Sequence, residues 1–80
     1  MSGVPREWDY EEVFDTLERG CGDFLLELRT LIAEIAPGTS VLVASRDAGA
    51  PIEVPAWCRM TGHTLREARP PFFLIEKRKT

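Results

Sequence analysis

Residues 22–38, GDFLLELRTLIAEIAPG, carry the apolar pattern that most constrains the fold of this chain. The apolar side chains recur at i, i+1, i+4, i+7, i+8 and i+11, which places them on one side of a helix: Phe24, Leu25, Leu28, Leu31, Ile32 and Ile35. The other side carries Glu27, Arg29, Thr30 and Glu34. The pattern therefore predicts an amphipathic helix, which Pro37 and Gly38 end.

Four shorter segments have the character of strands. Residues 13–18, VFDTLE, alternate, and residues 39–45, TSVLVAS, are β-branched and almost continuously apolar. Such a continuous run is expected of a strand that is covered on at least one face. Residues 63–68 and 72–77 are two further strands, which we expect to form an antiparallel hairpin around residues 69–71.

A second helix is predicted between the second strand and the hairpin. Asp47 is a candidate N-cap, Pro51 suits a first helical turn, and Gly62 ends the helix. Pro55 lies further in, so either the first turn is irregular or the regular helix begins near Val54. The apolar stripe of this helix consists of Val54, Trp57, Cys58 and Thr61. The predicted order of elements is β-α-β-α-β-β.

Length and charge narrow the class of protein. Eighty residues suit one small domain, 1–80, with a lead-in at 1–12 and a basic tail at 76–80. The formal net charge of -3 disfavours direct nucleic-acid binding, which needs a concentrated basic face. Lys77, Arg78 and Lys79 in the tail are either a solvated end or a docking patch for an acidic partner.

No stretch approaches the roughly 20 apolar residues that span a bilayer, so no membrane association is expected. The lead-in MSGVPREWDYEE lacks the pattern of a signal peptide, which favours a cytoplasmic location. In that reducing compartment the two cysteines are expected to be free thiols. Trp8 and Tyr10 in the lead-in either pad the first strand or contact a partner.

The predicted order of elements indicates which edge of the sheet carries the functional site. In a β-α-β unit with a right-handed crossover the first two strands run parallel, so both strand-to-helix turns open on one edge of the sheet. Reaction and ligand sites collect at that edge. The candidate site residues come from these two turns: Arg19, Cys21, Gly22, Asp23, Arg46 and Asp47.

Cys21 is the candidate nucleophile of this edge, because it precedes the first helix and lies between two glycines. A helix N-terminus stabilises a thiolate by about 0.3 to 1 kcal/mol, and about 1.4 kcal/mol corresponds to one pKa unit. Arg19 or Arg46 would add to this effect, whereas Asp23 and Asp47 would oppose it. We therefore expect an available and moderately activated thiol.

The chain resembles the TusA (SirA-like) family of small sulfur-carrier proteins over almost its whole length. The matching segments are RGCG before the first helix, PGTSVLV, the run DAGAPIEVPAWCRMTGHTL, and FFLIEK. The resemblance implies a two-layer α/β sandwich with a four-stranded mixed sheet and two helices on one face. It also implies that Cys21 accepts sulfur as a persulfide from a cysteine desulfurase or a rhodanese-like donor and passes it to an acceptor protein, without a cofactor.

One motif departs from the family pattern. The family has Cys-Pro-x-Pro, whereas this chain has Cys21-Gly22-Asp23-Phe24. Proline fixes the backbone at a helix start, and Gly22 leaves it freer. Two functions stay open: a sulfur carrier, and a noncatalytic interaction or regulatory module that keeps the fold without the sulfur relay. A helix-free sheet face, either solvated or paired in a dimer, would offer such a module a surface.

The remaining candidates favour structural roles. Cys58 lies on the apolar stripe beside Trp57, so we expect inert packing. His63 follows the second helix, away from the Cys21 edge, and is expected to be a hydrogen-bonded structural group. The same geometry disfavours a disulfide between Cys21 and Cys58. One histidine and two separated cysteines do not form a metal site.

Overall fold

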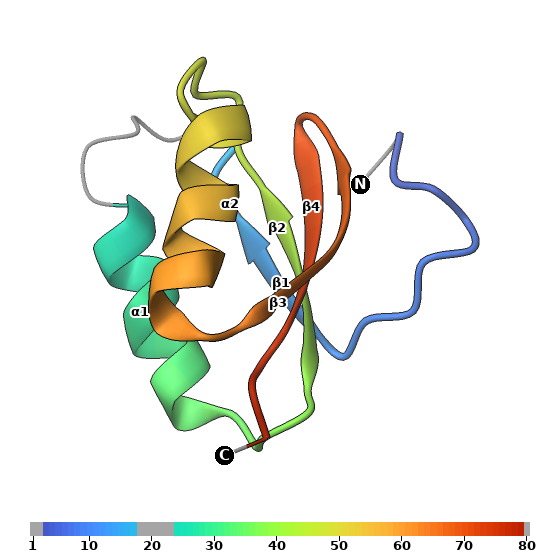
Figure 1. Ribbon diagram of the computed structural model, residues 1–80. Coiled ribbons are helices and arrows are strands. Elements are labelled where there is room, and N and C mark those ends of the chain that lie inside the picture. Colours follow the sequence, from blue (N-terminus) through green and yellow to red (C-terminus); the bar gives the residue numbers. More distant parts are fainter. Residues whose placement is uncertain (1–2, 18–23, 80) are drawn as a thin grey trace.

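The computed structural model describes residues 3–17 and 24–79 (Figure 1). The elements are β1 (Glu12–Asp15), α1 (Phe24–Glu34), β2 (Ser40–Ala44), α2 (Ala50–Thr61), β3 (Thr64–Arg69) and β4 (Phe72–Glu76). Their order confirms the predicted β-α-β-α-β-β sequence of elements. The described part of the chain contains no helix that is long and apolar enough to cross a membrane.

The four strands form one mixed sheet in the order β1-β2-β4-β3. β1 runs parallel to β2, with Phe14 opposite Val43, as the right-handed crossover predicts. β4 is antiparallel to both of its neighbours, which confirms the hairpin of β3 and β4. Both helices cover the same face of the sheet (Figure 1). The fold is therefore the two-layer arrangement with a four-stranded mixed sheet and two helices on one face.

The main core lies between the helices and this face of the sheet. Leu28 and Ile32 of α1 are buried, as the helical periodicity predicts. Strand alternation sends every second residue of β2 and β4 into the same core. Its buried members are Leu28, Ile32, Val41, Val43, Ala50, Val54, Trp57, Cys58, Phe73 and Ile75.

A second apolar cluster covers the opposite face of the sheet. It consists of Trp8, Leu42, Ala44, Phe72 and Leu74, with Val4 and Leu17 packed against it. Residues 3–11 run along the side of the sheet away from the helices (Figure 1), where Glu11 N–H donates to the Ser40 carbonyl at 2.9 Å. Trp8 therefore packs against the sheet and does not project toward a partner. The apolar side chains on this face are covered by the chain itself, so they are neither solvated nor open to contact by a second copy.

The start of α2 differs from the prediction. Gly49 is the N-cap and no side chain caps the helix, so the prediction of Asp47 as N-cap was wrong. The Asp47 backbone carbonyl instead accepts the Ala50 N–H at 3.0 Å, which leaves its carboxylate free of a capping role. Gly62 ends the helix as predicted, in the left-handed conformation at φ 84° that suits glycine.

Regular helix also extends through Pro55 from Ala50, rather than beginning near Val54. A proline removes the hydrogen bond to the carbonyl four residues earlier, here that of Pro51. Pro51 is exposed in the first turn, and the helix continues past Pro55 to Thr61 without that bond. β1 ends earlier than predicted, at Asp15, although Thr16 still bonds to the Ala44 carbonyl of β2.

Trp8 is expected to be an anchor of the fold, because its side chain is only 9% exposed whereas that of Tyr10 is 38% exposed. Trp8→Ala should lower the free energy of unfolding by about 3 kcal/mol, the usual cost of deleting a buried aromatic ring. Tyr10→Ala, the matched control in the same segment, should cost much less. Urea unfolding measures both, and equal losses would contradict the anchoring role of Trp8.

Candidate functional site

The predicted edge exists in the structure. β1 and β2 end side by side, with Asp15 opposite Ala44. Both helices begin at this end of the sheet, α1 at Phe24 and α2 at Ala50 (Figure 1). We call this end the carboxyl edge. Of the predicted site residues, Arg46 and Asp47 are described, whereas Arg19, Cys21, Gly22 and Asp23 lie outside the described residues.

Hydrogen bonds fix the beginning of the turn between β1 and α1, as far as Leu17. The Thr16 hydroxyl, which is buried, donates to the Ala44 carbonyl at 2.6 Å, and the Thr16 N–H donates to the same oxygen at 2.9 Å. The Leu17 N–H then bonds to the Asp15 carboxylate at 2.9 Å. These bonds hold the chain against β2 immediately before residues 18–23.

The second turn places an acidic group of side chains at the start of α2. Ser45 is buried, and its hydroxyl accepts the Asp47 N–H at 3.2 Å. A Cβ built on Gly49 would lie 2.9 Å from a Glu53 carboxylate oxygen and 3.4 Å from one of Asp47. Both carboxylates thus flank Gly49 at the positive end of the helix, where negative charge is stabilising. They would oppose a second negative charge nearby, as the sequence predicts for Asp47.

An open pocket of about 470 Å³ lies at the same edge, beside the hairpin turn. Its described lining is Gly3, Leu17, Arg46, Arg69, Pro70, Pro71 and Phe72. Arg46 was predicted as a site residue, whereas Arg69 was missed. The predicted hairpin was the sequence feature that could have revealed Arg69. Phe72 pairs with Ala44 of β2 on one side and with Arg69 of β3 on the other. An antiparallel return therefore brings the end of β3 to the end of β2.

Cys58 has the structural role that the sequence predicts. It is a free thiol that is 3% exposed. Burial raises the pKa of Cys58 to about 11, because a thiolate in an apolar core loses its hydration. A protonated, covered thiol is neither a nucleophile nor a metal ligand.

His63 is hydrogen-bonded at the other end of α2, as predicted. Its Nδ1 accepts the Arg78 backbone N–H at 3.1 Å, and its ring centroid lies 5.4 Å from that of Trp57. Two tail cations bind the helix ends beside it. Lys77 Nζ donates to the Ile35 carbonyl at 2.6 Å, and the Arg78 guanidinium donates to the Thr61 carbonyl at 3.0 Å. The basic tail thus satisfies carbonyls that a helix C-terminus leaves without partners.

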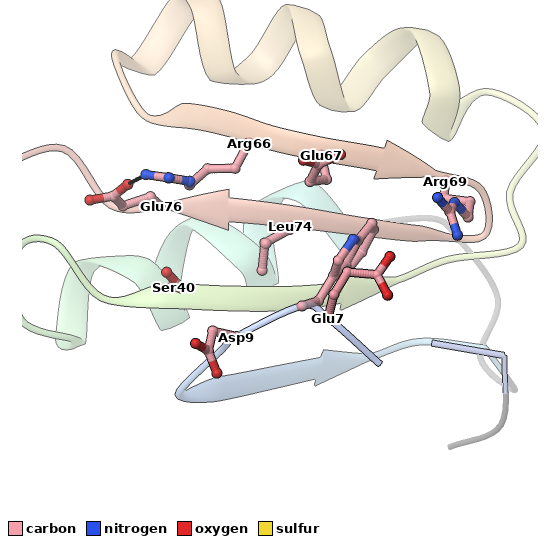
Figure 2. Close-up of a pocket in the computed structure, with 9 residues that line it drawn as sticks. Glu7, Asp9, Ser40, Arg66, Glu67, Arg69, Leu74 and Glu76 are labelled. Carbon is pink, nitrogen blue, oxygen red and sulfur yellow. Dashed lines mark hydrogen bonds and ion pairs between the residues drawn. The ribbon is translucent and has the colours of Figure 1, made fainter. Parts of the chain in front are cut away.

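A third feature is a groove of about 420 Å³ on the sheet face away from the helices (Figure 2). Figure 2 shows Arg66 meeting Glu76 at one end of the groove, where they form an ion pair, and Arg69 at the other. The lining residues are Glu7, Trp8, Asp9, Ser40, Arg66, Glu67, Arg69, Leu74 and Glu76. Both signs of charge are present in this groove, and its acidic lining residues outnumber the basic ones.

No protein-family model matches the chain, and no curated protein matches it. Within residues 3–17 and 24–79, no three His, Cys, Asp or Glu side chains are grouped as metal ligands.

His63 should make stability depend on pH. Its pKa is lowered from 6.5 because burial disfavours the imidazolium, and the cations of Arg78 and Lys77 repel it further. The unfolded chain then binds the proton more readily, so this contribution to stability is present above pH 6.5 and is lost as the pH falls toward the folded pKa.

We expect the free energy of unfolding to fall between about pH 7.5 and 5.5, and His63→Asn to reduce that fall. Urea titrations at several pH values measure this. Because His63 is the single histidine of the sequence, an NMR titration reports its pKa without ambiguity. A histidine pKa above 6.5, or an identical pH dependence in the variant, would contradict the assignment.

Proposed function

We propose that this protein is a sulfur carrier that accepts sulfur as a persulfide on Cys21 and relays it to an acceptor protein. The observation that carries the proposal is the burial of the other cysteine of the chain, Cys58. Cys58 is buried with its pKa raised to about 11, which leaves Cys21 as the candidate for thiol chemistry. The resemblance of the RGCG and PAWCRMTGH segments to the TusA family supports the same assignment.

The edge geometry also supports the proposal. Residues 18–23 connect Leu17, which lines the pocket with Arg46 and Arg69, to Phe24 at the start of α1. Carboxyl edges of parallel strands are where reaction sites collect. Arg46 and Arg69 would favour an anionic sulfur donor or an acidic partner surface, while Asp47 and Glu53 would limit how strongly a thiolate is stabilised. The thiol need only be moderately activated, since exchange depends on thiolate fraction and access.

The proposed transfer balances without an oxidant. The Cys21 thiolate attacks the terminal sulfur of a donor persulfide, held on a cysteine desulfurase or a rhodanese-like protein. The donor S–S bond breaks, the donor cysteine leaves as a thiolate, and Cys21 becomes the persulfide. An acceptor nucleophile then takes that terminal sulfur and restores the Cys21 thiolate. A reducing, cytoplasmic setting, which keeps the thiol free between cycles, is part of the proposal.

A noncatalytic interaction module is the second candidate function. Leu26 and Ile52 are 60% and 76% exposed, and they lie on α1 and α2 near the carboxyl edge. Exposed apolar side chains that form one contiguous patch serve protein contacts. A carrier also needs a docking surface at that edge, so the exposed residues alone fit both functions. Sulfur loading separates them.

The proposal predicts a gain of one sulfur mass when the protein is incubated with a cysteine desulfurase and cysteine. Intact-mass spectrometry should show the gain in the wild type and in Cys58→Ala, and reductant should remove it. Cys21→Ser should show none. A rhodanese loaded with thiosulfate provides a second donor.

Failure of both donors to load the wild type, while Cys21 still reacts with an alkylating agent, would overturn the carrier proposal in favour of the interaction module. Loading of Cys21→Ser would place the chemistry elsewhere.

A further inference from the structure

We propose that a groove at the C-terminal ends of the two helices binds an acidic segment of a partner protein that also carries apolar side chains. This proposal is independent of sulfur carriage. The groove measures about 350 Å³ and lies at the end of the sheet opposite the carboxyl edge. We call it the basic groove. Its described lining is Arg29, Ile32, Ala33, Trp57, Met60, Thr61, His63, Lys77 and Arg78.

The positive charge of the groove favours a negatively charged ligand. Three cations line the basic groove, from α1 (Arg29) and from the tail (Lys77 and Arg78), and none of the described lining residues is acidic. The outer-face groove of Figure 2, by contrast, has Glu7, Asp9, Glu67 and Glu76 among its lining residues. In a chain of net charge -3, this gathering of cations marks a site for carboxylates.

Two of these cations are already held in place. Lys77 is fixed by its bond to the Ile35 carbonyl, and Arg78 by its bond to the Thr61 carbonyl. A lysine ammonium has three donors and a guanidinium has five, so each retains donors for a ligand. Because these bonds already direct both cationic groups toward the helix ends, a carboxylate that binds there costs less further side-chain entropy. The His63 Nδ1 accepts the Arg78 N–H, which leaves Nε2 as the protonated nitrogen of the neutral ring and a further donor.

The apolar part of the groove points to a peptide rather than a free anion. Met60 lines the groove and is 82% exposed, whereas Val54, Trp57 and Cys58 of the α2 apolar stripe are buried. A flexible methionine side chain adapts to apolar groups of different shape. A free anion would bind the cations and leave Met60 in water, whereas an acidic peptide segment would contact both.

Nucleic acid fits this groove less well. Sequence-tolerant binding of single strands needs exposed aromatic faces, and Trp57 is only 7% exposed.

The test uses a fluorescein-labelled peptide of alternating glutamate and leucine, with fluorescence anisotropy as the readout. Arg29→Glu should weaken binding by about tenfold, because one ion pair is lost and one repulsion is gained. Arg6→Glu is the matched control, since it makes the same charge change at an exposed position in residues 3–11. It should change the affinity by less than about twofold. Met60→Ser should weaken binding several-fold at constant charge.

Circular dichroism would confirm that each variant is folded, and Arg29→Gln, which only removes the charge, should lie between wild type and Arg29→Glu. Equal losses in Arg6→Glu and Arg29→Glu would overturn the proposal, as would the absence of binding by the wild type. Tighter binding of a single-stranded oligonucleotide of the same length would assign the groove to nucleic acid instead. Repeating the titration with Cys21→Ser separates this site from the proposed sulfur chemistry, because the affinity should be unchanged.

Discussion

Burial of β2 and β4 on both faces is the constraint on which the rest of the fold depends. Val41, Val43, Phe73 and Ile75 pack under the helices, while Leu42, Ala44, Phe72 and Leu74 pack under residues 3–11. Two helices that lie on the same side of a four-stranded sheet cover only one of its two faces. The segment around Trp8 supplies the second cover, so this small domain has two apolar layers in place of one.

The two ends of the molecule differ in chemistry because β1 and β2 run opposite to the two helices that follow them. Strand carboxyl ends and helix N-termini meet at the carboxyl edge, where Thr16 and Ser45 are buried and hydrogen-bonded beside Arg46 and Asp47. Helix C-termini meet at the other end, and their negative carbonyls are bound by Lys77 and Arg78. The proposed sulfur chemistry and the proposed acidic partner therefore use opposite ends of the sheet and need not compete.

Periodicity predicted the elements well because it reports burial directly. The stripes of α1 and α2 and the short apolar strands gave the order and the hairpin, and the crossover rule gave the parallel β1 and β2 pair. Trp8 was left undecided, because REWDYEE has no period and its contacts are distant in sequence. The continuous apolar runs VLVA and FFLI were the available signal, since strands covered on both faces lose their alternation.

Predictions from residue preferences alone were wrong or incomplete where the path of the backbone determines which groups meet. Asp47 is a preferred N-cap residue, yet the chain turns into α2 two residues later, at Gly49. Tail lysine and arginine residues are usually solvated, but here the ends of both helices lie within their reach. Arg69 joined the carboxyl edge only through strand register, which depends on the complete sheet.

The sulfur-carrier proposal requires that Cys21 is accessible and that Cys58 is not. Native-state alkylation measures this difference most directly. The intact protein would be treated with iodoacetamide for increasing times, and each cysteine located by peptide mapping. We predict that Cys21 is modified at the rate of an accessible thiol, while Cys58 reacts only after denaturant is added. Protection of Cys21 to the same degree as Cys58 would contradict the account, because a covered thiol cannot receive sulfur from another protein.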